Sequence, residues 1–230
     1  MLWSRKGMKT SLTLKDESPN QGISPGRPRA TKVHSASLLK LCPTGALVEK
    51  DNWIRVDEAR CIRCQLCRQH TPPMEWDEDF HWAKLNTHRF PHAFRHSLHI
   101  RVIDAGNCGA CLNEIHQLSS PVYSFHRFGI SITPTPREAD VLMVVGPVTI
   151  AMKTALEEAY EAMPTPKRVL AVGACALSGG LFASSFSVVG PVSNVIPVDV
   201  EISGCPPPPL AILDGLRQVM GVRLASDRER

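Results

Sequence analysis

The sequence predicts an α/β protein in which a domain with a parallel sheet follows a small cysteine-rich module. From residue 98 onward, short β-type apolar runs alternate with longer helical stretches, which is typical of a parallel sheet covered by helices on both faces. Of the eight cysteines, four lie within residues 42–67 and four are spread over residues 108–205. The chain has 230 residues, 43% of them hydrophobic, which is enough for one ordinary α/β domain and a smaller module.

The chain divides into five segments. Residues 1–33 are polar and rich in Ser, Pro, Lys and Gly, and we expect either a flexible tail or a strand-free arm that lies on a partner. Residues 34–72 form the cysteine module, and residues 73–97 form a connector that carries four histidines among Trp and Phe. Residues 98–222 form the sheet domain, and residues 223–230 form a tail.

The elements of the sheet domain place its cysteines. Strands are expected at residues 98–104, 140–145, 168–172 and 195–202, and helices at 110–118, 149–163 and 210–220. The last helix starts among prolines, which suit a first turn because it needs no N–H donors. Cys108 and Cys111 follow the first strand, Cys175 follows the third and Cys205 the fourth. Because the carboxyl ends of parallel strands meet at one edge of a sheet, these four thiolates are predicted to meet there.

Charge and hydropathy exclude several classes of function. A net charge of +4 without a long run of Lys or Arg argues against a nucleic-acid partner. No apolar stretch approaches the roughly 18 residues of a membrane helix. No apolar signal core follows the basic N-terminus, so we expect a cytoplasmic protein. In that compartment eight cysteines favour metal over disulfides. Neither a Walker lysine nor a GxGxxG motif after a strand is present, so no NADH or ATP binding is expected.

The cysteines of the module have the spacing of an iron–sulfur protein. Cys61, Cys64 and Cys67 reproduce the beginning of the bacterial ferredoxin run, whose fourth cysteine is replaced here by Thr71. In two-cluster ferredoxins the Cys-Pro of one run ligates the cluster of the other, and Cys42 is followed by a proline. The module therefore resembles a ferredoxin-like α+β domain reduced to one 4Fe-4S cluster, held by Cys42, Cys61, Cys64 and Cys67.

Two alternatives stay open for this module. Paired Cys-x-x-Cys is also a zinc pattern, although three cysteines at a spacing of three suit one face of a cubane better. His70 or His81 could replace Cys42 as the fourth ligand of a cluster.

The second domain carries a family resemblance. Three stretches accompany the pair Cys108 and Cys111, namely residues 141–149, residues 173–180, and residues 196–200 leading to Gly204-Cys205-Pro206-Pro207. Together they resemble, over residues 98–221, the small subunit shared by nickel–iron hydrogenases and respiratory complex I. The resemblance implies a flavodoxin-like domain that binds one 4Fe-4S cluster next to a large catalytic subunit. The implied ligands are Cys108, Cys111, Cys175 and Cys205.

Two departures narrow this resemblance. Complex I subunits have two adjacent cysteines where this chain has Cys108 and Cys111 separated by two residues. The separated form is similar to that of energy-converting hydrogenases and formate hydrogenlyases. After Cys205 and two prolines the complex I pattern continues Arg-Pro-Glu, whereas this chain reads Pro-Pro-Leu. A hydrogenase-type relative is therefore favoured over a complex I-like quinone oxidoreductase that lacks nickel and iron.

Further residues near the second cluster have expected roles. Gly173, Gly179 and Gly180 would let the backbone approach the cluster and point N–H groups at its sulfides, unless they form an ordinary strand-to-helix turn. In hydrogenase relatives the acid that matches Glu114 sits between the cluster and the large subunit and passes protons, so the resemblance implies that role here. The alternative is that Glu114 only stabilises a helix N-terminus.

The ligand count gives the expected function. Two 4Fe-4S clusters consume all eight cysteines, so no thiolate remains for a nickel–iron centre. The chain is expected to be a non-catalytic electron-transfer subunit of an oxidoreductase complex on the inner face of the cell membrane. Its expected partners are a large catalytic subunit and further iron–sulfur and membrane subunits. The rival hypothesis is a zinc-stapled assembly protein.

Overall fold

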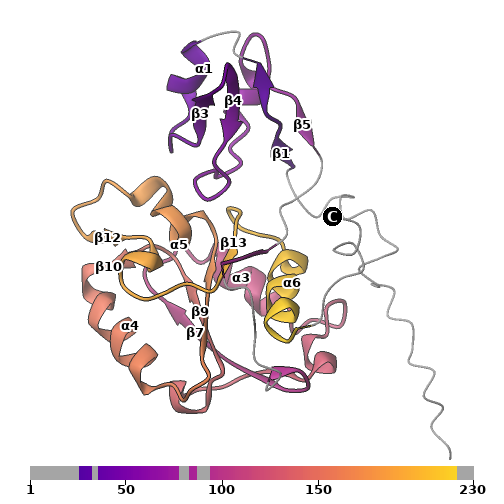
Figure 1. The fold of residues 1–230 in the computed structure, drawn as a ribbon, viewed down its shortest axis with the longest axis vertical. Helices are drawn as coiled ribbons and strands as arrows, with labels where there is room; N and C mark the ends of the chain where they lie inside the picture. The colour runs from indigo at the N-terminus through magenta and orange to yellow at the C-terminus, as the bar shows by residue number, and fades with distance from the viewer. Residues whose placement is uncertain (1–25, 33–35, 78–82, 87–93, 222–230) are drawn as a thin grey trace, which may run out of the picture.

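The larger domain is built on a six-stranded sheet (Figure 1). The computed structural model describes residues 26–32, 36–77, 83–86 and 94–221. The strand order is β6-β13-β11-β9-β7-β8, and all neighbours pair in parallel except the edge strand β6, which runs antiparallel to β13. The strands are Lys84–Leu85 (β6), Leu98–Asp104 (β7), Ile130–Ile132 (β8), Val141–Val145 (β9), Arg168–Val172 (β11) and Val200–Ile202 (β13).

The topology confirms the predicted fold class. Counted along the chain from β7, the parallel strands lie in the order 2-1-3-4-5, which is the flavodoxin-like arrangement. The order reverses between β7 and β9. In open sheets of this kind, ligands bind outside the carboxyl ends of the strands near such a reversal.

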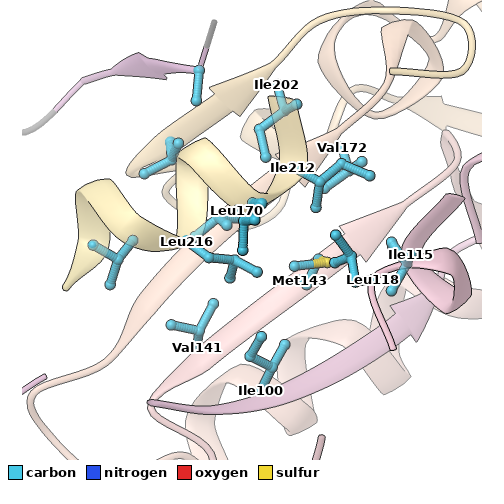
Figure 2. Packing of buried hydrophobic residues seen from close by; sticks show 14 of the residues in the cluster. Ile100, Ile115, Leu118, Val141, Met143, Leu170, Val172, Ile202, Ile212 and Leu216 are labelled. Atoms are coloured by element: carbon cyan, nitrogen blue, oxygen red, sulfur yellow. The ribbon is translucent and has the colours of Figure 1, made fainter. Parts of the chain in front are cut away.

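Helices cover both faces of the sheet. They are Ala110–Gln117 (α3), Ile150–Ala162 (α4), Ala174–Ser178 (α5) and Pro209–Val219 (α6). Successive side chains of a strand point to opposite faces, so β9 contributes Met143 to one core and Leu142 to the other. The first core is closed by α3 and α6. Ile212 and Leu216 of α6 lie over the strands in Figure 2. The second core contains Leu156 of α4.

Most elements of this domain agree with the sequence prediction. The first and third predicted strands have the predicted bounds, the second begins one residue later, and all three predicted helices form. The fourth strand was predicted too long, because only Val200–Ile202 pairs within residues 195–202. Pro197 has no N–H for a ladder hydrogen bond, and pairing with β11 begins after it. The parallel strand β8 was not predicted.

The cysteine module forms a separate small layer. Its antiparallel sheet has the order β2-β4-β3, and Leu38, Leu47, Ile54 and Met74 form its core. The elements are Arg27–Pro28 (β1), Thr31–Lys32 (β2), Ala36–Leu41 (α1), Leu47–Lys50 (β3), Trp53–Val56 (β4), Leu66–Gln69 (α2) and Trp76–Asp77 (β5). Figure 1 shows this module on the side of the sheet domain that carries α5 and the segment between β13 and α6.

The described parts of both flanking segments contain short strands. A strand-free arm over residues 1–33 is wrong for its described part, because β1 pairs with β5 and β2 pairs with β4. The connector is also structured in part, since β5 belongs to the module and β6 joins the large sheet. Residues 1–25 and the expected tail, residues 223–230, lie outside the described residues.

Shorter elements complete the sheet domain. A two-stranded antiparallel ribbon joins Val148–Thr149 (β10) to Val188–Gly190 (β12). Single 3-10 turns occur at Phe125–Phe128, Pro136–Glu138, Gly180–Phe182 and Val192–Asn194. Within the described ranges, none of the helices has both the length and the apolar character needed to span a membrane.

Candidate functional site

The four cysteines of the module line one cavity. Cys42 follows α1, Cys61 and Cys64 lie in the loop before α2, and Cys67 lies within α2. All four contribute to the wall of the same cavity, which Trp76 also lines. The structure therefore brings Cys42 next to the three cysteines of the ferredoxin run.

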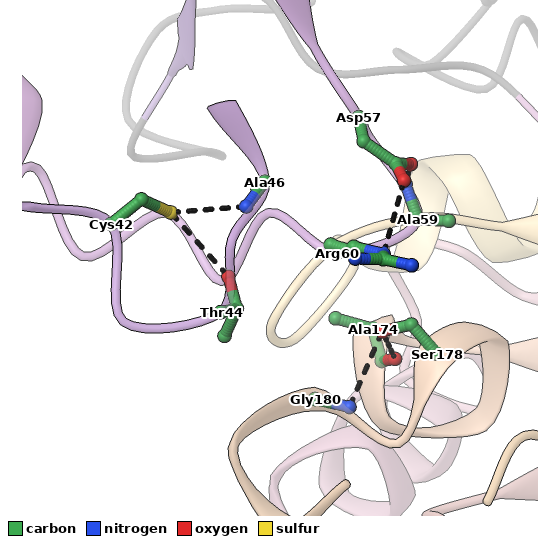
Figure 3. A network of polar contacts seen from close by, with 9 residues as sticks. All are labelled: Cys42, Thr44, Ala46, Asp57, Ala59, Arg60, Ala174, Ser178 and Gly180. Carbon is green, nitrogen blue, oxygen red and sulfur yellow. Dashed lines mark hydrogen bonds and ion pairs between the residues drawn. The ribbon is translucent and has the colours of Figure 1, made fainter. Parts of the chain in front are cut away.

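The turn after Cys42 favours its thiolate. Sγ of Cys42 lies 3.2 Å from the backbone nitrogen of Ala46 and 3.6 Å from Oγ1 of Thr44 (Figure 3). Burial alone would raise the pKa of Cys42. The hydrogen bonds from Thr44 and from the backbone of residues 44, 46 and 47 outweigh burial and lower this pKa below its ordinary value. Since the thiolate is the form that binds metal, this turn suits a ligand.

Burial disfavours the thiolate at Cys61 and Cys67, two other cysteines of this cavity. Burial raises the pKa of Cys61 to about 11, and it also raises that of Cys67, where the neighbouring indole N–H of Trp76 opposes the shift. Nε1 of Trp76 is itself buried and, apart from its interaction with the Cys67 thiol, has no hydrogen-bond partner among the described residues. A buried donor at the wall of a four-thiol cavity fits a group that brings sulfide acceptors with it.

The alternative ligands do not share this arrangement. Nε2 of His70 lies 2.9 Å from Oγ of Ser37, and Nδ1 lies 3.2 Å from the carbonyl oxygen of Pro72. Both ring nitrogens are thus engaged by the protein. Thr71 is exposed and does not line the cavity. His81 lies outside the described residues. These contacts favour Cys42 over His70 as the fourth ligand.

The remaining four cysteines gather at the carboxyl edge of the large sheet. Cys108 lies in the loop after β7, Cys111 in α3, Cys175 in α5 after β11, and Cys205 in the segment after β13. Burial, together with smaller contributions from the thiols of Cys205, Cys175 and Cys108, raises the pKa of Cys111 to about 12. Burial also raises the pKa of Cys175 to about 11, again with added effects of Cys205 and Cys108. Thiols far apart in the sequence therefore lie within electrostatic reach of one another.

The donor set fits an iron–sulfur cluster. All eight thiols are free. In the part of the chain that the structure describes, no three His, Cys, Asp or Glu side chains have the geometry to hold a single metal ion. Cysteines that lie close together and are partly buried become thiolates together only if a positive charge compensates them. A four-iron core supplies that charge and, being larger than one ion, reaches thiols that stand further apart.

Two glycines make room for the cysteine sulfurs of the sheet domain. A Cβ atom on Gly173 would lie 2.6 Å from Sγ of Cys111, and one on Gly180 would lie 2.8 Å from Sγ of Cys175. Both glycines have positive φ, +91° and +55°. The backbone at Gly173 and Gly180 therefore approaches the sulfurs of Cys111 and Cys175 closely.

The expectation that the N–H groups of Gly173, Gly179 and Gly180 point at cluster sulfides is wrong. The N–H of Gly173 donates to the carbonyl of Ile202, and that of Gly179 donates to the carbonyl of Cys175. The N–H of Gly180 donates to Oγ of Ser178 (Figure 3). These groups hold β11 to β13 and close the turn at the end of α5, so they are not available to sulfides.

The loop before Cys108 is fixed by a residue that the sequence reading missed. Oδ1 of Asp104 accepts hydrogen bonds from the N–H groups of Gly106, at 2.9 Å, and Asn107, at 2.8 Å. Burial tends to raise the pKa of Asp104, but these hydrogen bonds lower it overall. An Asp followed by Gly and Asn is a recognisable turn signal, so the sequence did contain this information.

Glu114 lies one turn beyond Cys111 on α3. Its side chain is half-buried, and this burial raises its pKa above the usual range of a carboxyl group. The charge of Glu114 in turn adds to the increase in the pKa of Cys111. The structure therefore places Glu114 beside the second group of cysteines.

Comparisons with known proteins agree with this geometry. Residues 108–219, which include all four cysteines of the sheet domain, match the family described as NADH ubiquinone oxidoreductase, 20 Kd subunit. The chain is 46% identical over 136 residues to an uncharacterized protein of Methanocaldococcus jannaschii, covering 59% of this chain and 91% of that one. It is 42% identical over 114 residues to the probable membrane-bound hydrogenase subunit mbhJ of Pyrococcus furiosus, covering 50% of this chain and 68% of that one.

Two further similarities are partial. Formate hydrogenlyase subunit 7 of Escherichia coli is 37% identical over 150 residues, which cover 65% of this chain and 58% of that subunit. A chain in the structure of the membrane-bound sulfane sulfur reductase, an archaeal respiratory membrane complex, is 36% identical with a TM-score of 0.50, covering 56% of this chain and 71% of that one. The similar sequences, the flavodoxin-like strand order and the four cysteines at one sheet edge all point to the same family. This chain belongs to the family of the NADH ubiquinone oxidoreductase 20 Kd subunit.

Proposed function

We propose that this chain is the electron-transfer subunit of a membrane-attached, energy-converting complex of the nickel–iron hydrogenase type. In this proposal it holds two 4Fe-4S clusters, and electrons pass through both to or from a large catalytic subunit. The observation that carries the proposal is the division of all eight cysteines into two groups of four, with no thiol left over. The similarity to subunits named for a membrane-bound hydrogenase and a formate hydrogenlyase supports this type of complex.

The protein's own part in this function is to hold and tune the two sites. Each bound cluster would accept and release one electron at a time. The turn from Cys42 to Ala46 stabilises one thiolate by hydrogen bonds, and Cys111 is buried beside the second group of cysteines. Two clusters would use all eight cysteines and leave none for a nickel–iron centre, so the substrate reaction is assigned to another subunit.

An exposed apolar patch supports docking of that subunit. Phe186 is 95% exposed, and Ile150 is 62% exposed. The backbone N–H of Ile150 donates to the carbonyl of Ser187, so the two regions adjoin. Leu181 and Phe182, in the turn after α5, are also exposed. Exposed apolar residues next to Cys175 are what a subunit interface beside the second site requires.

In this proposal the chain is attached to the membrane only through other subunits of its complex. The described helices do not span a membrane. The chain would therefore sit peripherally on the inner face, held by membrane subunits of the complex. We propose no nucleic-acid partner and no nucleotide bound to this chain.

A second candidate is favoured by the description of the matching family. That description names NADH ubiquinone oxidoreductase, so the chain could serve a complex I-like quinone oxidoreductase that lacks nickel and iron. The two candidates differ in the large subunit. A co-purifying large subunit with two Cys-x-x-Cys pairs would bind nickel and support the hydrogenase type, whereas one without them would support the quinone oxidoreductase.

Metal analysis tests the proposed cofactors. Protein purified anaerobically should contain about eight iron and about eight acid-labile sulfide per chain. About four iron would remove one of the two clusters from the proposal. Stoichiometric zinc without iron would instead support the zinc-stapled assembly protein.

A further inference from the structure

Helix α6 carries a buried carboxylate in a largely apolar stretch. Asp214 is only 1% exposed, and Leu213 and Gly215 on either side of it are buried as well. A carboxylate removed from water is costly unless hydrogen bonds compensate it. Oδ2 of Asp214 accepts from the backbone N–H of Ala83, at 3.2 Å, and from Nε2 of Gln218, at 2.6 Å. The buried carboxylate therefore binds a segment that lies 131 residues earlier in the chain.

Ala83 is held by both of its backbone polar groups and by its side chain. Its N–H donates to Asp214, and its carbonyl oxygen accepts from Nε2 of Gln218 at 3.1 Å. Gly215 leaves room for its side chain, because a Cβ atom on Gly215 would lie 3.2 Å from Cβ of Ala83. Asp214 and Gln218 are four residues apart and project from the same side of α6. These two side chains form a clamp on the backbone of one residue, which we call the Ala83 clamp.

The Ala83 clamp holds the beginning of the edge strand β6. This strand has two residues, and both pair with β13. Directly after it, the N–H of Asn86 donates to the carbonyl of Asp199 at 2.8 Å. An edge strand of two residues is shorter than most strands and gains little from its ladder alone. Residues 84–86 are thus bound by the sheet domain along one side, and Ala83 is bound from α6.

The Ala83 clamp lies close to the cysteine module in the sequence. Strand β5 of the module ends at Asp77, so the tether from the module to the clamp is residues 78–82. A tether of this length spans at most about 20 Å. After β6, the next described residue in the core of the sheet domain is Phe94, which is 2% exposed. If the clamp and β6 came loose, the tether would become residues 78–93.

We propose that Asp214 and Gln218 are positioning residues that keep the cluster site of the module close to that of the sheet domain. The inference rests on the proposed function, because it concerns electron exchange between two clusters. In that exchange the reduced cluster of one site loses one electron and the cluster of the other site gains it. The exchange requires the two sites to be close, so the length of the tether affects its rate.

The size of the effect follows from the length of the tether. For a tether that behaves as a flexible linker, the effective concentration of one site at the other falls roughly as the −3/2 power of length. Going from residues 78–82 to residues 78–93 lowers that concentration roughly sixfold. Loss of the clamp should slow electron exchange between the clusters by a factor of this order.

Hydrogen exchange of the full chain tests the clamp itself. Asp214→Ala and Gln218→Ala should each speed exchange of the amides of residues 83–86 roughly tenfold or more, because each removes a partner of the buried Ala83 backbone. Lys84→Ala is the matched control. It removes from the same segment an exposed ion pair, 3.4 Å from Nζ of Lys84 to Glu201, and should leave the exchange unchanged. If Asp214→Ala does not fold, Gln218→Ala decides, because Gln218 is only half-buried. Unchanged exchange in Gln218→Ala would overturn the clamp.

The rate of electron transfer between the clusters tests the positioning role. In the full chain, purified anaerobically, a photoreductant reduces the module's cluster and rapid-freeze EPR follows the second one. Cys42→Ala identifies the module's signal, because that signal disappears. Gln218→Ala should slow the transfer roughly sixfold while both signals and both midpoint potentials stay as in the wild type. Lys84→Ala should keep the wild-type rate.

The outcomes separate the inference from the proposed function. A wild-type chain without two cluster signals would refute the two-cluster function and with it the positioning role, whereas the exchange rates would still report the clamp. Two signals with an unchanged transfer rate in Gln218→Ala, despite faster hydrogen exchange, would overturn the positioning role and leave the function intact. Equal slowing in Lys84→Ala would also overturn it, because any change in β6 would then have the same effect.

Discussion

The sulfur of Cys111 lies where a side chain on Gly173 would have to be. A Cβ atom on Gly173 would stand 2.6 Å from Sγ of Cys111, a distance that real Cβ atoms do not tolerate. The two residues come from different strand ends, after β11 and after β7. Gly173 therefore fixes how closely α3 can approach the beginning of α5.

The first prediction follows from this contact. Gly173→Ala should remove the EPR signal of the second cluster and leave that of the module, because the added methyl group displaces Cys111. The positive φ adds a cost of about 1–3 kcal/mol. Gly109→Ala is the control, since Gly109 also has a φ of 90° but nothing lies within 4 Å of its Cβ position. Equal loss of signal in both variants would assign the effect to backbone strain alone.

The second prediction concerns the fourth ligand of the module. Cys42→Ala should abolish the module's cluster, because Cys42 completes the wall of thiols formed with Cys61, Cys64 and Cys67. Thr71→Ala should leave it intact, because Thr71 is exposed and outside that cavity. Iron content and EPR spectra of both variants provide the measurement. An unchanged spectrum in Cys42→Ala would show that another side chain is the ligand.

The third prediction concerns the apolar patch. Phe186→Glu and Leu181→Glu should each weaken co-purification of the large subunit by at least about tenfold, because a charge would be buried without a partner. Both clusters should remain, since the two side chains are exposed in the free chain. Val122→Glu is the control. Val122 is 58% exposed but lies past the C-terminal end of α3, away from the cysteine edge. Undiminished co-purification in the patch variants would place the partner elsewhere.

Much of the sheet domain could be predicted because its central strands β9 and β11 are almost entirely buried. Every residue of β9 is apolar and inaccessible, so a continuous apolar run between turn residues was a sufficient signal. The parallel strand β8 carried no such signal. It has three residues, with Ser131 between two isoleucines, and it becomes a strand only because β7 offers it an open edge.

The cysteine ligands could be predicted because their positions follow from spacing along the chain or from the order of the strands. The spacing of Cys61, Cys64 and Cys67 is local, and the order of parallel strands determines where Cys175 and Cys205 meet. The roles of Asp214 and Trp76 depend on how distant segments cover them, and no spacing in the sequence reports that burial. The N–H directions at Gly173 were missed for the same reason, because they depend on pairing with β13.

The last prediction concerns Glu114, which we propose as a proton-transfer residue between the second site and the large subunit. Its carboxyl group lies one turn after Cys111, and burial raises its pKa above the usual range. The protonated form therefore persists to higher pH than in an exposed carboxyl group. A gain or loss of charge at the adjacent site should move this pKa further, so electron and proton uptake would be coupled there.

Glu114→Gln keeps the size and the hydrogen-bonding capacity of the side chain but cannot release a proton. The assembled complex should keep both clusters and its electron transfer to dyes, whereas proton-coupled turnover should fall at least about tenfold. Glu114→Asp, which retains an ionisable group, should keep part of that turnover and its pH dependence. The measurement is turnover against pH for the three proteins, with dye reduction as the internal reference. Full turnover in Glu114→Gln would rule out the proton-transfer role; a helix-end charge effect is not the alternative, because Glu114 lies beyond the first turn of α3.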